Sequence, residues 1–231
     1  MSKRAEPLSR DMLSSDCVLF RGLSGVELER VAAIGQLQEI EGHCYLFHQH
    51  TPSQRVYNLI SGAAMVERTS SGGQRQILAF LFPGDFVGMT HSDHLEYSVR
   101  SLRLTRLCEF RQQRLLALAE ELPILKTNVK QVGANILARA LDQIYILGKK
   151  KAHERLCFLF MQLLERLPGA SPARIDLPMS RQDIADYLGL TIETVSRSLA
   201  RLKQEGLIAA PSPQRLQIVD LEHTRALASA D

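Results

Sequence analysis

Residues 179–207 constrain the fold more than any other part of the chain, because they join two short helical patterns through a tight turn. Ser180 can cap a first helix that runs to about Leu188. Gly189 follows its last turn, where a left-handed backbone is commonly needed. Thr191 can cap a second helix. Two helices joined in this way form a helix-turn-helix.

The second helix is predicted to have two chemically distinct faces, since its side chains are spaced at about 100° per residue. The apolar side comprises Ile192, Val195, Leu199 and Leu202. The polar side comprises Glu193, Ser196, Arg197 and Arg201. In a helix-turn-helix, the N-terminal residues of the second helix enter the DNA major groove. The segment therefore indicates DNA binding.

Three side chains on the polar side suit the edges of DNA bases. Arg197 can donate two hydrogen bonds to a guanine, and Glu193 can accept one from a cytosine, while Ser196 can contact a thymine or a neighbouring base. Phosphate contacts, which position without specifying, are predicted for Arg181, Thr194, Ser198 and Arg201. The alternative is that Glu193 and Arg197 form an ordinary surface ion pair one helical turn apart.

The N-terminal half reads as strands separated by glycine-containing turns, from about Leu23 to Arg111, which is typical of a β-roll or jelly roll. Candidate strands are Val56–Ile60, Ala63–Arg68, Gln76–Phe82 and Leu102–Phe110. A helical piece, Gln112–Leu122, follows. Near the C-terminus, Leu207–Ala209 and Leu216–Val219 are expected to form a two-stranded wing. The predicted fold class is α+β.

A long amphipathic helix begins at Pro123 and is expected to run for about 40 Å. That length exceeds what one small barrel can cover, so we expect one side to pair with a second copy in a two-fold homodimer. The predicted dimer interface is Val132, Ile136, Ala140, Ile144 and Leu147, widened by Leu137 and Leu141. The alternative is a core helix lying wholly on the barrel.

Composition bounds the class of protein only broadly. A hydrophobic fraction of 45% and a charged fraction of 23% are ordinary for a globular chain. The longest apolar stretch, Leu156–Met161, is too short to span a membrane, and the N-terminus has no apolar core of a signal peptide. We therefore expect a cytoplasmic protein without membrane contact. A net charge of +3 does not by itself indicate nucleic acid.

Two segments resemble the Crp/Fnr superfamily of bacterial transcription regulators. FPGDFVG (82–88) resembles the family's barrel signature, and SRQDIADYLGLTIETVSRSLARLKQEGLI (180–208) resembles its winged helix-turn-helix. The resemblance implies a cyclic-nucleotide-binding-like β-roll, a long dimerisation helix and a C-terminal winged helix-turn-helix. The corresponding domains are an N-terminal arm (1–22), the β-roll (23–122), the dimerisation helix (123–150) and the DNA-binding domain (151–231).

The spacing Glu-x-x-Ser-Arg resembles the Fnr/FixK branch of that family. This resemblance implies a palindrome similar to TTGAT-NNNN-ATCAA, read by Glu193, Ser196 and Arg197. It also implies RNA polymerase as a partner and a role in microaerobic or anaerobic gene control.

Two departures from the family bear on the signal. Tyr97-Ser98 stands where the cyclic-AMP-binding members have Arg-Ser, so the anionic phosphate would lack its arginine. Cys17 and Cys108 match at most two of the four thiolates that an iron–sulfur cluster wants. We therefore expect a FixK-like regulator with no cofactor, no metal and no enzymatic activity. Whether Cys17, Cys44 or Cys108 is redox-sensitive stays open.

Histidines in the barrel segment support a rival interpretation. They are His43, His48, His50, His91 and His94, and GHCYLFHQH (42–50) matches the opening of the cupin metal motif. Imidazoles on jelly-roll strands can hold a divalent metal or haem iron. The alternatives are thus a haem- or metal-binding gas or redox sensor, or a cupin-like metalloprotein.

Overall fold

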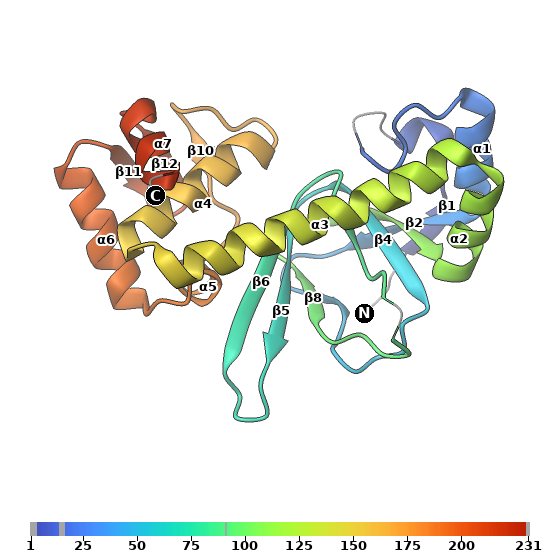
Figure 1. Ribbon diagram of the computed structural model, residues 1–231, viewed down its shortest axis with the longest axis horizontal. Coiled ribbons are helices and arrows are strands. Elements are labelled where there is room, and N and C mark those ends of the chain that lie inside the picture. The colour runs from blue at the N-terminus through green and yellow to red at the C-terminus, as the bar shows by residue number, and fades with distance from the viewer. Residues whose placement is uncertain (1–3, 14–16, 91, 230–231) are drawn as a thin grey trace. The chain divides into compact units, whose positions relative to one another are not determined.

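A computed structural model describes residues 4–13, 17–90 and 92–229 of the chain (Figure 1). It divides into two compact units, described here one at a time. Unit 1 consists of Met1–Gly72 and Leu78–Arg139, and unit 2 of Gly73–Ile77 and Ala140–Asp231. Of the helices in the described ranges, none combines the length and the apolarity of a membrane span.

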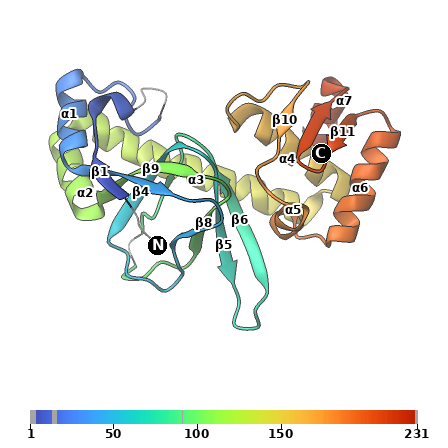
Figure 2. The ribbon, with the colours of Figure 1, turned by 180° about the vertical axis from the view of Figure 1, so that it is seen from behind.

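Unit 1 is built on two antiparallel sheets, the first of which can be followed in Figure 2. In the first sheet, the strand order is β1 (Arg4–Pro7), β2 (Gly35–Ile40), β9 (Thr105–Arg111), β4 (Arg55–Ser61) and β7 (Phe86–Val87). In the second, it is β3 (Tyr45–Phe47), β8 (Ser98–Ser101), β5 (Ala64–Thr69) and β6 (Arg75–Leu81). Both sheets contribute to one core, which includes Leu46, Leu59, Val66, Val99 and Leu107. The predicted β-roll is confirmed.

Helices close one side of this roll with a second core. The helices are η1 (Arg10–Met12), α1 (Gly25–Ala33), α2 (Gln112–Glu121) and the first part of α3 (Pro123–Lys149). Phe20, Phe110, Leu115 and Leu125 are fully buried at its centre. Phe20 and strand β1 both come from the segment expected to be a separate arm, and β1 pairs with β2 along Arg4–Pro7. Residues 4–7 are therefore part of the roll.

Two boundaries differ from the predictions. The strands expected from Leu23 onward are preceded by a helix, α1, because Ser24 and Glu27 form a capping box at its start. The strand expected from Leu102 begins only at Thr105, since Leu102 is held by a hydrogen bond from its N–H to the Ala63 carbonyl at 2.8 Å. The first difference arises from hydrogen bonds between neighbours in the sequence, whereas the second involves a hydrogen bond to a residue far away in the sequence.

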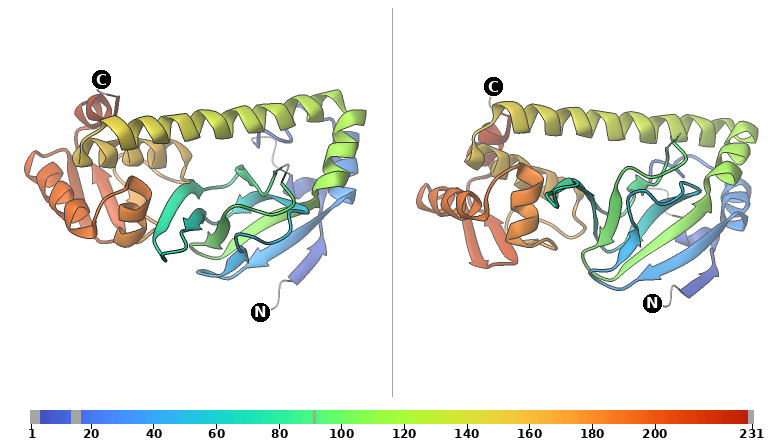
Figure 3. Two further views of the ribbon diagram at one scale, coloured as in Figure 1. Left: turned by 60° about the horizontal axis from the view of Figure 1, so that its bottom comes forward. Right: turned by 90° about the horizontal axis from the view of Figure 1, so that it is seen from below.

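Unit 2 contains the expected helix-turn-helix and wing. In chain order its elements are the C-terminal part of α3, α4 (Ala152–Arg166), β10 (Ile175–Asp176), α5 (Arg181–Leu188), α6 (Ile192–Gln204), β11 (Ile208–Ser212), β12 (Arg215–Ile218) and α7 (Leu221–Ser229). Strand β12 lies between β10 and β11, so the wing has one strand more than predicted. Helix α4 packs against α6 and α7. Figure 3 shows α3 as one continuous helix.

Candidate nucleic-acid interface

Helix α5 begins and ends, and helix α6 begins, where the sequence predicts. The Ser180 hydroxyl accepts the Asp183 N–H at 3.1 Å, and the Asp183 carboxylate accepts the Ser180 N–H at 2.9 Å, which forms a capping box. Gly189 ends α5 with a left-handed backbone, at a φ of +62°. The Thr191 hydroxyl then accepts the Thr194 N–H at 3.2 Å and starts α6. The Ser-x-x-Asp spacing was a further sequence signal for this turn.

Helix α6 separates its faces as the sequence predicts, with one exception at each face. Val195, Leu199 and Leu202 are buried, whereas Glu193, Ser196 and Arg197 are exposed. Ile192, expected on the apolar side, is 38% exposed. Ser198, expected to reach a phosphate, is only 9% exposed. Ser198 lies on the buried side of α6 with Val195, Leu199 and Leu202, so in this structure it is not placed to reach a phosphate.

The three predicted base readers are exposed, although the Ser196 hydroxyl donates to the Ile192 carbonyl at 2.9 Å and so has only its acceptor sites left. The N–H of Glu193 and the Thr191 hydroxyl lower the pKa of the Glu193 carboxyl, and the charge of Arg197 adds a smaller effect. The carboxylate is therefore ionised at neutral pH and accepts hydrogen bonds. Arg197 donates to the Thr194 hydroxyl at 3.5 Å, and in the described structure it forms no direct ion pair with Glu193. An acceptor and a fork of donors thus lie side by side on one exposed face.

The remaining side chains predicted to contact phosphates differ in their exposure and in the hydrogen bonds they already make. Arg201 is exposed but bound by Glu205 at 2.7 Å. Thr194 is half-buried, and its hydroxyl lies 3.1 Å from that of Thr191. Burial lowers the pKa of Arg181, whose Nη1 has no hydrogen-bond partner in the described chain. Arg181 is therefore a partly buried cation with an unused donor.

Helix α3 carries a strip of exposed apolar residues. We call this strip the apolar face of α3, and it comprises Ile136, Leu137, Ala140, Leu141 and Ile144. Two members of the predicted dimer interface lie elsewhere: Val132 is buried in the core of unit 1, and Leu147 is half-buried. Leu137 and Leu141, which the sequence analysis placed at the margin, are more exposed than either. The exposed strip is thus shifted relative to the predicted one.

In unit 1, the residues at the family's ligand positions are bound by the chain itself. The Tyr97 hydroxyl accepts the Gly88 N–H at 3.2 Å. The Ser98 hydroxyl is buried and accepts the Gln49 N–H at 2.9 Å. These groups already have hydrogen-bond partners within the roll.

The candidate redox thiols of unit 1 are mostly buried. Burial raises the pKa of Cys17, and burial together with the neighbouring Cys17 raises the pKa of Cys108 to about 12. Asn58 donates to the Cys17 sulfur at 3.2 Å. Cys44 is half-exposed. Cys17 and Cys108 are therefore neutral core thiols at neutral pH, and Cys44 is the accessible one.

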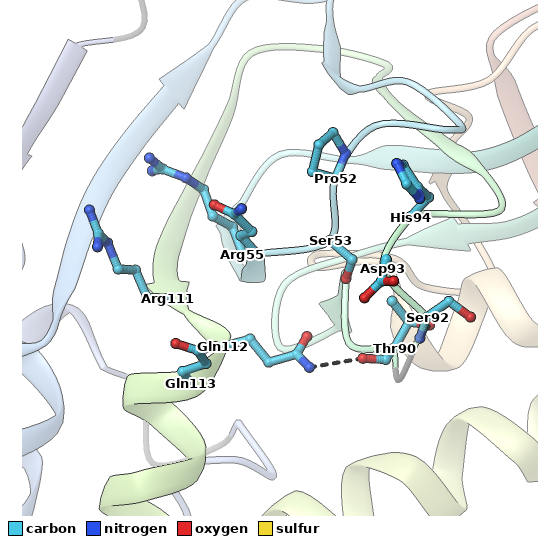
Figure 4. A pocket seen from close by; sticks show the side chains of 11 residues that line it. Pro52, Ser53, Arg55, Thr90, Ser92, Asp93, His94, Arg111, Gln112 and Gln113 are labelled. Atoms are coloured by element: carbon cyan, nitrogen blue, oxygen red, sulfur yellow. Dashed lines mark hydrogen bonds between the residues drawn. The ribbon is translucent and has the colours of Figure 1, made fainter.

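The barrel histidines are dispersed in the described structure. His94 lines a polar pocket of about 710 Å³ between the start of β4 and the start of α2, together with Ser53, Thr90 and Arg111 (Figure 4). His48 instead packs against Tyr45, with their ring centroids 4.2 Å apart, and His91 lies outside the described residues. Within the described ranges, no three histidines, cysteines or carboxylates gather to hold a metal. The cupin-like interpretation finds no ligand set there.

Each of the two units contains a segment that matches a known domain family. Residues 37–121 match the cyclic nucleotide-binding domain family, and residues 154–227 match the Crp-like helix-turn-helix domain family. The chain is 33% identical over 224 residues to the nitrogen fixation regulation protein FixK of Bradyrhizobium diazoefficiens, which covers 94% of each protein. It is 36% identical over 188 residues to the transcriptional activatory protein AadR of Rhodopseudomonas palustris, which covers 80% of this chain and 78% of that one.

A solved structure agrees with the fold. The structure of FixK2 from Bradyrhizobium japonicum superposes with a TM-score of 0.80 at 28% identity, and covers 86% of this chain and 99% of that one. Because the similarity extends over nearly the whole chain and both domain families match, the protein belongs to the Crp/Fnr family and is a DNA-binding transcription regulator of the Fnr/FixK type, not an enzyme.

Proposed function

We propose that the protein binds a palindrome similar to TTGAT-NNNN-ATCAA as a homodimer and regulates transcription from it. The observation that carries this proposal is the joint exposure of Glu193, Ser196 and Arg197 in the N-terminal half of α6. Arg197 reads the guanine through two hydrogen bonds, Glu193 accepts from a cytosine N4, and Ser196 contacts the adjoining base.

Phosphate contacts come from the side chains that keep usable donors. The Arg181 Nη1 is buried and has no hydrogen-bond partner in the described chain, so Arg181 reaches a phosphate by turning its half-buried guanidinium toward solvent. Arg201 exchanges the Glu205 carboxylate for a phosphate. Thr194, half-buried in the first turn of α6, adds its hydroxyl. These contacts set affinity and its dependence on salt, whereas the base readers set sequence preference.

The homodimer forms through the apolar face of α3. Ile144 is 66% exposed and Leu137 60% exposed, and their neighbours on the strip are apolar too. A contiguous apolar strip on a long helix is stabilised by pairing with a second copy of itself about a two-fold axis. The two recognition helices then lie about 34 Å apart, one turn of B-DNA, and read successive major grooves.

The proposed regulator works without cyclic AMP and without an iron–sulfur cluster in the chain. Tyr97 offers a phosphate no positive charge, and its hydroxyl is used by Gly88. Cys17 and Cys108 are buried thiols, two of the four that a cluster wants. The similarity to proteins named for nitrogen fixation regulation supports a role in low-oxygen gene control in the cytoplasm, with RNA polymerase as the partner for activation.

Fluorescence anisotropy on the palindrome tests this proposal. The protein is treated with chelator and given no ligand, and a duplex mutated at the guanine is the control. We expect tight binding to the palindrome and at least about tenfold weaker binding to the control. Equal binding to both duplexes would contradict the assigned base readers.

A further inference from the structure

One arginine of α4 ties together the ends of two other helices in unit 2. Arg155 donates from Nε to the Lys150 carbonyl at 2.9 Å and from Nη2 to the Leu147 carbonyl at 2.8 Å. Its Nη1 donates to the Leu188 carbonyl at 2.8 Å. The first two carbonyls belong to the C-terminal end of α3 and the residue after it, and the third to the last residue of α5. A single guanidinium therefore joins the end of α3 to the turn before α6.

Two neighbouring contacts make the same connection. Gln143 of α3 is buried, and its Nε2 donates to the Tyr187 carbonyl of α5 at 2.8 Å. A Cβ placed on Gly189 would lie 3.4 Å from the Leu147 side chain, so the turn and α3 are already in close contact. The carbonyls of Tyr187 and Leu188 at the end of α5 thus accept hydrogen bonds from side chains of α3 and α4.

The chemistry of this junction suits arginine and no other residue. The carbonyl groups at a helix C-terminus carry partial negative charge, and Arg155 faces two such ends at once. Its guanidinium is planar and presents its donors in a fixed fork, whereas a lysine ammonium is a compact charge on a flexible stem. Three carbonyls bound by one rigid plane are fixed relative to one another. A lysine at the same position keeps the charge but cannot fix them.

We propose that Arg155 is a positioning residue that sets the half-site spacing the dimer accepts. This inference rests on the proposed function, because it needs a dimer paired through α3 and a palindrome read through α6. We call the three hydrogen bonds of Arg155 the clamp. Its contact with the Leu188 carbonyl lies only three residues before Thr191, the cap of α6. The clamp holds each recognition helix at one angle to its own α3. Since α3 is the element shared by the dimer, that angle determines the distance and rotation between the two reading faces.

The test varies the DNA and the clamp together. Anisotropy is measured on palindromes with NNN, NNNN, NNNNN and NNNNNN spacers, and on the NNNN duplex mutated at the guanine. The proteins are the full-length wild type, Arg155→Lys, Gln143→Met and a control, Arg225→Lys, whose side chain is exposed on α7. Circular dichroism and a thermal melt check that each variant is folded.

For the wild type and Arg225→Lys, we expect about tenfold or more weaker binding whenever the spacer changes by one base pair, since each insertion rotates and displaces a half-site. Arg155→Lys should reduce this spacing preference to about threefold or less, with an intermediate effect for Gln143→Met. Both should keep the wild-type preference for the guanine, because α6 itself is unchanged.

Three outcomes would overturn the inference. The first is a folded Arg155→Lys protein that keeps the full spacing preference. The second is a variant that loses the guanine preference as well, which would make Arg155 part of the folding of the reading helix rather than of its placement. The third is a wild type that prefers the guanine but no spacing, which would leave the base readers intact and remove the two-fold arrangement. A wild type that does not discriminate at the guanine would overturn the proposed function itself, and this inference with it.

Discussion

The helix-turn-helix and the β-roll use their polar side chains in opposite ways. In α6, the carboxylate of Glu193 and the guanidinium of Arg197 stand exposed with donors and acceptors to spare. In the roll, the Tyr97 and Ser98 hydroxyls are taken by backbone N–H groups, and Cys108 is fully buried. Recognition chemistry in this chain therefore lies on an exposed face, whereas the groups at the family's ligand positions in the roll are hydrogen-bonded by the chain itself.

The largest effect is expected from a charge on the apolar face of α3. Ile144→Glu would place two carboxylates in the proposed two-fold seam, where they repel each other and lose solvation. We expect a monomer by light scattering. Affinity for the palindrome should fall about a hundredfold or more, because the half-sites are no longer read by linked modules. Ala138→Glu, exposed on the same helix outside that face, is the matched control and should remain dimeric. A dimeric Ile144→Glu protein would contradict the assigned seam.

The next largest effect concerns the reading face. Arg197→Ala removes both hydrogen bonds to the guanine, and a bidentate contact of this kind is worth about 1–3 kcal/mol, or about 10- to 100-fold in affinity. Anisotropy should show that loss on the palindrome and little change on the guanine-mutated duplex. Arg225→Ala, an exposed arginine of α7, should bind like the wild type. If Arg197→Ala still discriminated between the two duplexes, another side chain would have to read the guanine.

The helix-turn-helix could be predicted from the sequence because its determinants are local. Ser180, Gly189 and Thr191 each specify a cap or a turn within a few residues. Ser198 could not be placed in the same way, since the burial of that side of α6 depends on packing against other elements, among them α4, which is distant in the sequence. Arg155 escaped the sequence analysis for a similar reason. Its three acceptors are backbone carbonyls, which leave no pattern in the side chains.

In the roll, too, contacts between residues distant in the sequence could not be predicted from local patterns. Its strands were predicted from short runs separated by glycine-containing turns, but β1 and the core position of Phe20 depend on pairing and packing with residues far along the chain. Cys17 and Cys108 illustrate this most clearly. Their types suggested reactive groups, whereas their reactivity depends on burial among residues from several elements.

A smaller effect is expected from a substitution that tests whether water reaches the buried thiol of Cys108. Cys108→Ser replaces a buried thiol by a hydroxyl that must find a hydrogen bond, at a cost of about 1–3 kcal/mol in the free energy of unfolding. Urea unfolding measures this loss. Cys44→Ser, at a half-exposed position, should change stability by less than about 0.5 kcal/mol. Equal stability of the two variants would mean that water or a polar group reaches Cys108.

The pH dependence of the free energy of unfolding also tests the burial of the Cys108 thiol. The folded-state pKa of Cys108 is about 12, above the unfolded value of 9.0, so its contribution is fully present below pH 9. It is lost as pH rises from 9 to 12, because the unfolded chain then releases a proton that the folded chain keeps. Cys108→Ala should therefore show a shallower loss of unfolding free energy across that range than the wild type. Identical slopes would place the thiol in contact with solvent.

The smallest effect is expected at the turn that joins the reading helix to the rest of unit 2. Gly189→Ala puts a Cβ on a residue with a φ of +62°, where a side chain costs about 1 kcal/mol, while the nearest neighbour, Leu147, is 3.4 Å away and forces little movement. Gly169→Ala is the matched control, because its φ is +75° and a Cβ there meets nothing within 4 Å. Both variants should lose similar stability in urea. Only Gly189→Ala should also weaken binding to the palindrome, since its strain is relieved by shifting the start of α6, whereas Gly169 lies outside the helix-turn-helix. A Gly189→Ala protein that is as stable as the wild type would show that the turn does not need its left-handed residue.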